Sequence, residues 1–423
     1  MKILFLTENF PPETNAAATR VFERACYWIR DGHEVTVITQ APNFPFGKLY
    51  DGYKNNWRQI ETIEGIRVVR VKTYIAPNAG VARRTLDFVS YMFTAVWFGL
   101  LERRPDVVVS TSPQFFAAVG GWLIGALRRI PFVFELGDLW PASIVAVGAM
   151  KPSLAMRLVE KLELFLYRRS AVVVALTNAF KQNLIERGIN GNKVAVVING
   201  VDLPRYAPQD RDVALAQEWG LEDKFVVGYV GTHGMAHGLE NVLEAAAQLE
   251  HRNELVFLFA GPGAARDGLM QEAQERNLTN VVFIPSQPKD RMPAIWSLCD
   301  VALVHLKDTP VFAEVIPSKI FEAMGMGLPV LIAAPTGEAT AIVDKAGAGL
   351  VVPPEDANSL IQATERFLED PEFRTSASNR SFAAAPAHSR AFQAKAMMVA
   401  LDAAVTGTGD TASEQVEKVE PLS

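Results

Sequence analysis

Short runs of β-branched and other apolar residues alternate with longer helical patterns along nearly the whole chain. The apolar runs predict strands at 2–7, 34–39, 66–71, 106–111, 132–136, 171–177 and 193–198 in the first half, and at 225–231, 254–261, 280–285, 300–306, 329–334 and 349–352 in the second half. Strands that alternate with helices are typical of parallel sheets with helices on both faces. The pattern therefore predicts an α/β protein with two doubly wound sheets.

The restart of this pattern and the length of 423 residues predict two domains, because one hydrophobic core rarely serves so long a chain. The predicted parts, in chain order, are an N-terminal domain at 1–198, a linker at 199–222, a C-terminal domain at 223–385, a C-terminal helix at 386–405 and a tail at 406–423. The C-terminal helix is a candidate for return to the N-terminal domain. The tail has almost no large apolar residues, so we expect it to be disordered.

Charge, cysteine content and the lengths of the apolar runs argue against several classes of protein. The net charge of −6 and the sequence pI of about 5.7 argue against nucleic-acid binding through a broad basic face. The two cysteines, Cys26 and Cys299, argue for a reducing compartment and against a disulfide framework. The opening apolar run is too short for a signal peptide, and the apolar stretches 86–101 and 113–127 are too short to span a bilayer. We therefore expect a cytoplasmic protein.

The segment EVIPSKIFEAMGMG, at 314–327, contains a predicted helix start. Pro317 fits the first position of a helix, because its missing N–H costs nothing there. The first turn would then contain Ser318, Lys319 and Ile320. Backbone N–H groups in a first turn have no partner inside the helix and, with the helix dipole, they form an anion site. The segment therefore predicts a phosphate site.

Two carboxylates flank this helix start. Glu314 lies just before it, and Glu322 lies about one turn inside it. Carboxylates accept hydrogen bonds from sugar hydroxyls, whereas N–H groups and Lys319 suit a phosphate. The segment therefore favours a phosphate that carries hydroxylated groups on both sides. An ordinary amphipathic helix with two solvated glutamates is the alternative, because motif matches also arise by accident.

Glycines follow two further predicted strands of the second half. Gly231, Gly234 and Gly238 permit a tight loop at 231–238, and a Gly-Pro-Gly sequence follows the next strand at 261–263. Glycine lets backbone N–H groups approach a ligand closely, although glycine after a strand is usually plain turn chemistry. Both loops lie at the carboxyl ends of predicted strands, where open α/β sheets bind ligands.

Several motifs in one order resemble a known family. They are TENFPPE (7–13), DLWPAS (138–143), NGVD (199–202), the glycine loop (231–238), GPG (261–263), PSKIFEAMGMGLPV (317–330) and AGAGLVVPPED (346–356). The chain resembles the retaining GT-B glycosyltransferases of family four over about residues 1–400. Within that family it looks like bacterial polysaccharide and O-antigen enzymes, including N-acetylfucosaminyltransferases.

The resemblance implies a GT-B fold, in which two doubly wound Rossmann-like domains enclose an interdomain cleft. It also implies transfer of a sugar with retention from a nucleotide sugar to a lipid-linked or saccharide acceptor, in bacterial cell-surface polysaccharide biosynthesis. The expected donor is a UDP-sugar, with an N-acetylated amino sugar among the candidates. By this resemblance Glu322 would bind the ribose hydroxyls and Glu314 would face the transferred sugar. Lys319 and the backbone of Ser318 and Ile320 would lie by the diphosphate, with no metal and no cofactor.

The chain departs from the family pattern in two places. Many relatives carry an arginine and a lysine in the glycine loop, where this chain has Thr232 and His237. Relatives of the subgroup often have an arginine before DLWP, where this chain has Gly137. Lys319 and the helix start are therefore expected to neutralise more of the diphosphate. The donor-side candidates in the glycine-rich loops are Gly231, Thr232, His237 and Gly261.

Asp138 is the candidate on the acceptor or sugar side. It follows the predicted strand 132–136 of the first domain. With Glu314 and Lys319, it completes the set of candidate catalytic residues. The alternative role is that of a helix N-cap ahead of LWPASIVAVG, because aspartate is a favoured cap.

Other enzyme classes fit less well. A metal-dependent transferase would need an Asp-x-Asp sequence after a strand, but Asp210 and Asp212 lie in the predicted linker. His233 and His237 have a metal-like spacing but no evident further ligands. No predicted strand is followed by the Gly-x-Gly-x-x-Gly fingerprint of a dehydrogenase. Two alternatives stay open: a GT-B sugar-nucleotide epimerase, and a catalytically silent nucleotide-sugar-binding partner subunit.

Four arginine pairs in the first domain suggest contact with an anionic membrane surface. They are Arg83 and Arg84, Arg103 and Arg104, Arg128 and Arg129, and Arg168 and Arg169. Two pairs flank an apolar helix at 85–102, and basic residues near a bilayer are attracted to anionic lipids. The insertion groups expected to be exposed on this helix are Phe88, Tyr91, Met92, Trp97 and Phe98. We therefore predict peripheral contact with the inner face of the cell membrane, with a core helix that has solvated arginine ends as the alternative.

Overall fold

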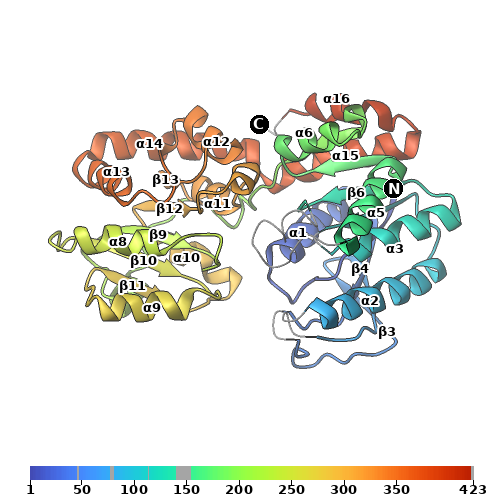
Figure 1. The fold of residues 1–423 in the computed structure, drawn as a ribbon, viewed down its shortest axis with the longest axis horizontal. Helices are drawn as coiled ribbons and strands as arrows, with labels where there is room; N and C mark the ends of the chain where they lie inside the picture. The colour runs from blue at the N-terminus through green and yellow to red at the C-terminus, as the bar shows by residue number, and fades with distance from the viewer. Residues whose placement is uncertain (45–46, 77–80, 113, 140–153, 421–423) are drawn as a thin grey trace. The chain divides into compact units, whose positions relative to one another are not determined.

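The computed structural model describes residues 1–420, apart from 45–46, 77–80, 113 and 140–153. The chain forms two compact units, each built around one sheet that is covered by helices (Figure 1). The first unit contains Met1–Asn199 and Arg390–Glu420, and the second contains Gly200–Ser389.

The first unit contains an eight-stranded sheet with the order β3-β4-β2-β1-β5-β6-β7-β8. Its strands are β1 (Lys2–Leu6), β2 (Glu34–Gln40), β3 (Arg58–Ile63), β4 (Ile66–Val71), β5 (Val107–Thr111), β6 (Phe132–Leu136), β7 (Val172–Ala175) and β8 (Val194–Val196). Neighbouring strands are parallel except for the antiparallel pair β3 and β4. The α-helices among its described residues are α1 (Ala16–Arg30), α2 (Val81–Leu101), α3 (Phe115–Arg128), α5 (Leu154–Arg169), α6 (Asn178–Glu186), α15 (Arg390–Thr406) and α16 (Ala412–Glu417).

The second unit contains a six-stranded parallel sheet with the order β11-β10-β9-β12-β13-β14. Its strands are β9 (Phe225–Val230), β10 (Leu255–Ala260), β11 (Val281–Ile284), β12 (Val301–His305), β13 (Val330–Ala333) and β14 (Gly349–Val352). Its α-helices are α7 (Val213–Trp219), α8 (Glu240–Gln248), α9 (Arg266–Glu275), α10 (Met292–Ser297), α11 (Lys319–Gly325), α12 (Glu338–Ala346), α13 (Ala357–Glu369) and α14 (Pro371–Ala384). A short 3-10 helix, η3 (Pro310–Glu314), precedes α11.

The strand order of the second sheet reverses between β9 and β12, which makes a topological switch point. Connections on the two sides of a switch point leave in opposite directions, so a crevice forms at the carboxyl ends of these strands. In the first sheet the corresponding neighbours are β1 and β5. The switch points therefore mark where each unit can bind a ligand.

Every strand predicted from the sequence is present, with ends within two residues of the predicted ones. The edge strand β3 was missed. Its sequence, RQIETI, alternates exposed and half-buried residues and has few apolar positions, so it lacks the continuous apolar run of a central strand.

Within 406–420 the chain is helical and part of the first unit, which corrects the prediction of a disordered tail at 406–423 for these residues. Helices α15 and α16 lie against the other elements of that unit (Figure 1). Ala412 and Val416 of α16 are buried in the core, and the Lys181 ammonium lies 3.1 Å from the Glu417 carboxylate. Helix α7 also lies within the segment predicted as a linker.

The apolar helix that was expected to expose insertion groups is partly a core helix. Tyr91 of α2 has no exposed surface, and its hydroxyl donates to two main-chain carbonyls at 3.1 and 2.8 Å. Phe88, Met92 and Phe98 are half-buried, and guanidinium groups cover the rings of Phe88 and Phe98. Of the predicted insertion groups, Trp97 is exposed, whereas the prediction is wrong for Tyr91.

A different set of large apolar side chains is exposed on α2. They are Leu86, Phe93, Trp97 and Leu101, which are 50%, 66%, 65% and 61% exposed. Their spacing places them along one face of the helix. No helix in the described part of the chain has both the length and the apolar character needed to cross a membrane.

The packing of α15 can be tested with Leu401→Ala. We expect this change to lower the free energy of unfolding of the first unit by about 2–5 kcal/mol, because the side chain is fully buried and its removal leaves a cavity. Leu158→Ala in α5 is the matched control, because Leu158 is 67% exposed and its loss should cost less than about 0.5 kcal/mol. Urea denaturation followed by circular dichroism compares the two variants. Equal losses would contradict the burial of α15 in this core.

Candidate functional site

The glycine loop (231–238) follows β9 and meets the loop that follows β10. A Cβ atom at Gly261 would lie 2.2 Å from the Gly231 oxygen, and one at Gly263 would lie 2.2 Å from the His233 oxygen. Gly261 and Gly263 also have positive φ angles of 136° and 156°. Only glycine fits these two positions, because the backbones approach too closely for a side chain. The structure therefore brings together the two glycine-rich loops that the sequence analysis singled out.

His237 is held at the end of β12 by main-chain contacts. His305 Nδ1 lies 2.6 Å from the His237 oxygen, and His237 Nδ1 lies 3.3 Å from the His305 oxygen. The Asn241 amide nitrogen lies 3.0 Å from His305 Nε2, so Nε2 accepts and Nδ1 carries the proton. Burial, and then the charge of Lys319, lowers the pKa of His237 to about 4. His237 is therefore neutral near pH 7 and does not replace a positively charged phosphate ligand.

Lys319 brings α11 and the glycine loop together. Its Nζ lies 3.3 Å from the centre of the Tyr229 ring, and a Cβ at Gly231 would lie 3.2 Å from it. The ammonium is buried, and it has no hydrogen-bond partner among the described residues. Burial lowers the pKa of Lys319 to about 7, against the opposing effect of Glu322. Because a buried cation is costly without hydrogen-bond acceptors, this site favours an anionic ligand.

Helix α11 begins later than the sequence predicts. Lys319 is its first residue and Ser318 is its N-cap, so Pro317 lies outside the helix. The Ile320 N–H donates to the Pro317 carbonyl at 3.2 Å, which makes a tighter turn ahead of the helix. The side chain of Ile320 is fully buried. Of the predicted first turn, Ser318 and Lys319 are therefore better placed than Ile320 to face a ligand.

The two glutamates of the motif lie on separate elements. Glu314 ends η3, Glu322 lies in α11, and both are half-buried. The Trp296 indole N–H donates to Glu322 Oε2 at 3.1 Å. The sequence analysis missed Trp296, because a tryptophan within an apolar segment gives no signal beyond core packing.

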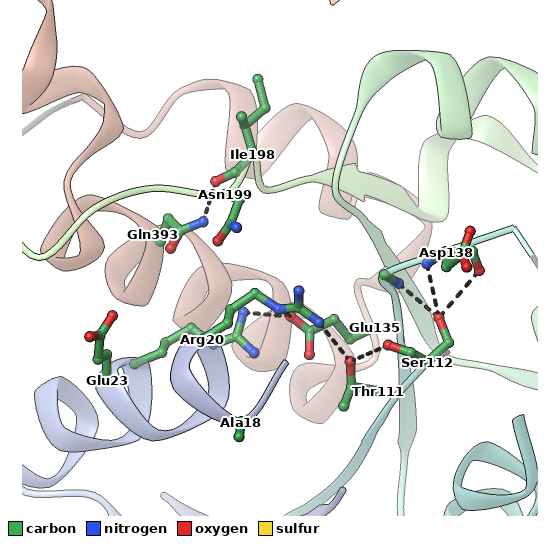
Figure 2. Close-up of polar contacts among 12 residues, drawn as sticks. Ala18, Arg20, Glu23, Thr111, Ser112, Glu135, Asp138, Ile198, Asn199 and Gln393 are labelled. Atoms are coloured by element: carbon green, nitrogen blue, oxygen red, sulfur yellow. Dashed lines mark hydrogen bonds and ion pairs between the residues drawn. The ribbon is translucent and has the colours of Figure 1, made fainter. Parts of the chain in front are cut away.

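In the first unit, Ser112 fixes the segment that follows β6. Its Oγ accepts the N–H groups of Gly137 at 2.8 Å and of Asp138 at 3.2 Å (Figure 2). Asp138 is half-buried directly after the strand. The alternative role of Asp138 as an N-cap concerns a helix within 140–153, which lies outside the described residues.

A buried ion-pair cluster joins α1 to β6, close to the segment that Ser112 fixes. Arg20 Nε and Arg24 Nη1 lie 3.2 and 2.8 Å from Glu135 Oε1, and Arg20 Nη2 donates to Thr111 Oγ1 at 3.1 Å (Figure 2). Burial raises the pKa of Glu135, but the two guanidinium groups outweigh burial and lower it to about 2. A Cβ at Gly137 would lie 3.0 Å from Arg20 Nη2, so Arg20 fills the space beside this glycine. Sequence reasoning missed this cluster because its members are far apart along the chain.

The TENFPPE motif contains two glutamates in different environments. Glu13 accepts four hydrogen bonds from neighbouring main-chain and amide N–H groups, which is typical of a structural carboxylate. Burial, and then the charge of Asp87, raises the pKa of Glu8 to about 8. Burial likewise raises the pKa of Asp87 to about 7. Glu8 and Asp87 therefore retain protons close to neutral pH.

Comparison with known proteins finds a family model for each half of the chain. The family model "Glycosyl transferases group 1" matches residues 214–383, and the model "Glycosyl transferase 4-like domain" matches residues 15–200. With both halves matched in this way, the chain is a glycosyltransferase. The glycine loop, Lys319 and both motif glutamates lie within the first of these matches.

This glycosyltransferase is similar to proteins of known name over most of its length. It is 28% identical over 391 residues to the Escherichia coli protein named "Putative colanic acid biosynthesis glycosyl transferase WcaI", with 89% of this chain and 94% of WcaI covered. It is 26% identical over 360 residues to a GDP-mannose-dependent alpha-mannosyltransferase of Mycobacterium tuberculosis, with 84% of each covered. The solved structure of Anabaena HepE in complex with UDP matches with a TM-score of 0.70 at 20% identity, covering 95% of this chain and 100% of HepE. The likeness confirms the predicted GT-B fold.

The buried amine of this glycosyltransferase can be tested through stability. Between about pH 7 and pH 10 the unfolded chain binds more protons at Lys319 than the native state does, because the native pKa is lowered. The wild-type free energy of unfolding therefore gains a contribution that rises with pH in this window. Lys319→Met should remove that contribution and should be more stable than the wild type at pH 7. Urea denaturation at about pH 7 and pH 9 measures both effects.

The matched control for this test is Lys345→Met in α12, where the lysine is exposed. This variant should keep the pH dependence of the wild type. If Lys319→Met also keeps it, the lowered pKa of Lys319 is wrong.

Proposed function

We propose that this glycosyltransferase binds a nucleotide sugar, with UDP as the nucleotide, at the carboxyl edge of the second sheet. The observation that carries the proposal is the buried Lys319 ammonium, which lies beside Gly231 without a hydrogen-bond partner among the described residues. A diphosphate would supply the missing acceptors. HepE, which has been solved with UDP and with UDP-glucose, supports this donor class. The mycobacterial relative is named for GDP-mannose, so GDP is the second nucleotide to test.

The candidate residues then divide the donor between them. Glu322 binds the ribose hydroxyls, and Glu314 faces the transferred sugar. Lys319, with the backbone of Ser318 and Ile320, lies by the diphosphate. The remaining donor-side positions, which act mainly through the backbone, are Gly231, Thr232, His237 and Gly261.

The proposed reaction is transfer with retention. The bond between the anomeric carbon and the diphosphate oxygen breaks, a bond from the acceptor oxygen forms on the same face, and the acceptor proton moves to the leaving phosphate. Fixed donors aimed at developing charge can each contribute about 3 kcal/mol, so Lys319 is the main catalytic group on the leaving-group side. Asp138 is assigned to the acceptor or to the transferred sugar.

The acceptor is proposed to be a lipid-linked or saccharide chain of a bacterial cell-surface polysaccharide. The name of WcaI, which refers to colanic acid biosynthesis, supports this process. The transferred sugar is a hexose or an N-acetylated amino sugar. Incubation of the protein with UDP-sugars, with and without a lipid-linked acceptor, tests the assignment. A changed UDP-sugar without acceptor would indicate an epimerase, and no turnover under either condition would indicate a silent partner subunit.

Substitution of Glu322 should lower the affinity for UDP, whereas substitution of Glu314 should mainly lower turnover. Glu322→Ala is expected to raise the dissociation constant of UDP at least about tenfold, because two ribose hydroxyls lose charged acceptors. Glu314→Ala should leave UDP affinity close to that of the wild type and should lower turnover more strongly. Calorimetry with UDP and GDP, and a transfer assay, separate these effects. Glu275→Ala, at an exposed glutamate of α9, is the control. Unchanged affinity for both nucleotides in Glu322→Ala would remove the ribose assignment.

We also propose that the first unit contacts an anionic membrane surface through α2. The exposed stripe of Leu86, Phe93, Trp97 and Leu101 supplies the apolar contact. The exposed arginines at both ends of the helix, among them Arg83 and Arg103, supply attraction to anionic lipids. Such a surface would place the enzyme beside a lipid-linked acceptor on the cytoplasmic face of the membrane.

Flotation with vesicles that contain phosphatidylglycerol tests this contact at low salt. Phe93→Ser with Trp97→Ser should reduce binding several-fold through the loss of apolar contact, and Arg83→Glu with Arg103→Glu should reduce it through charge reversal. Added salt should weaken the wild type. Leu158→Ser, an exposed leucine on α5, is the control. If the wild type does not float with anionic vesicles, a soluble acceptor becomes the better assignment.

A further inference from the structure

The indole N–H of Trp296 donates to a carboxylate. Trp296 lies in α10 and is fully buried, and its Nε1 lies 3.1 Å from Glu322 Oε2. A buried indole N–H needs an acceptor, and a hydrogen bond to a charged oxygen is shorter and stronger than one to a neutral oxygen. The contact therefore restrains one carboxylate oxygen of Glu322.

Trp296 is itself held in place by its neighbours. The Asp212 N–H at the start of α7 donates to Ser297 Oγ at 3.1 Å, and the Cys299 N–H donates to the Trp296 carbonyl at 3.0 Å. A Cβ at Gly228 in β9 would lie 2.1 Å from Cys299 Sγ, so the end of α10 packs directly against the sheet. These contacts fix the end of α10, and full burial of the Trp296 side chain restrains its indole.

Glu322 has an oppositely charged neighbour in its own helix. Lys319 lies three residues earlier in α11, a spacing at which opposite charges normally attract each other. The Lys319 ammonium instead lies 3.3 Å from the centre of the Tyr229 ring and has no hydrogen-bond partner among the described residues. Glu322 is held by Trp296. The ammonium thus lies against one buried aromatic ring, and the carboxylate accepts from another.

We propose that Trp296 positions the Glu322 carboxylate for the ribose hydroxyls of the donor nucleotide and keeps it from pairing with Lys319. This inference rests on the proposed donor site. Trp296 acts through Glu322 and is therefore a positioning residue. The indole N–H then sets the orientation of the carboxylate that meets the ribose, and the ammonium lies where it can meet the diphosphate.

The test compares UDP with 2′,3′-dideoxy-UDP, which lacks both ribose hydroxyls. Calorimetry on the full chain should show that Trp296→Phe weakens UDP binding about tenfold and leaves the binding of dideoxy-UDP within about twofold of the wild type. Only UDP uses the positioned carboxylate, so a general loss of packing would affect both ligands alike.

Trp28→Phe is the matched control. Trp28 is also fully buried, and its indole N–H donates to the Ala394 carbonyl at 3.0 Å in the first unit. The same chemical change is made there, in the unit that does not contain the proposed donor-site residues, and it should alter neither dissociation constant.

A second replacement separates the lost N–H from the cavity that phenylalanine leaves. Incorporation of β-(3-benzothienyl)alanine at position 296 keeps the shape of the indole and replaces the N–H with sulfur. It should reproduce the selective loss of UDP affinity. In the Glu322→Ala background, Trp296→Phe should cause no further loss, because the two residues act as one unit.

Two results would overturn the positioning role: equal weakening of both ligands by the benzothienyl variant, or an additive loss in the Glu322→Ala background. A failure of the donor site itself looks different. In that case the wild type binds UDP and dideoxy-UDP equally well, or Glu322→Ala keeps wild-type UDP affinity, and the ribose role of Glu322 is wrong together with the role of Trp296.

Discussion

Burial of the central strands on both faces determines where this chain can place polar chemistry. Strands β10, β12 and β13 consist entirely of buried residues, and β9 does so after its first residue. A parallel sheet covered in this way leaves its carboxyl edge for ligands, and the crevice opens at the switch point. The glycine loop, His305 and Lys319 all lie at the ends of, or against, the two strands that flank the switch point. The strand order of the second sheet therefore determines where the candidate site can form, whichever side chains line it.

Lys319 shows the cost of such a site. Its ammonium is removed from water and lies on an aromatic ring, where the cation–π contact offsets part of the desolvation. Perturbed titratable groups of this kind cluster at functional sites, because binding or catalysis needs them and stability does not. The neutral His237 next to it makes Lys319 the more effective positive charge beside the glycine loop. The second unit thus retains a destabilising charge for which an anionic ligand would compensate.

The first unit is held by contacts between distant parts of the chain. Helix α15 returns the C-terminal segment to this core. There the Trp28 indole N–H donates to the Ala394 carbonyl, and Arg390 Nε lies 3.0 Å from Glu23 Oε2. Arg20 and Glu135 lie at the carboxyl edge of the same sheet (Figure 2), and Arg24 also pairs with Glu135. Arg20 and Arg24 in α1 pair with Glu135 in β6, so the cluster holds these two elements together. Removal of one partner would be costly, because it would leave a buried charge uncompensated.

The sequence by itself determined the strands, the two doubly wound sheets and the motif residues, because apolar runs and glycine positions are local signals. It did not reveal β3, because this edge strand has few apolar positions. It did not reveal the helix α16 or the burial of Tyr91 either, because both depend on neighbours supplied by distant segments. The motif could place Lys319 near a phosphate, but only the tertiary structure decided that its ammonium lies on the Tyr229 ring. Likewise, only folding brings Trp296 to Glu322. The reason is physical: backbone preference and periodicity act over a few residues, whereas burial, pKa and hydrogen-bond partners are properties of the packed interior.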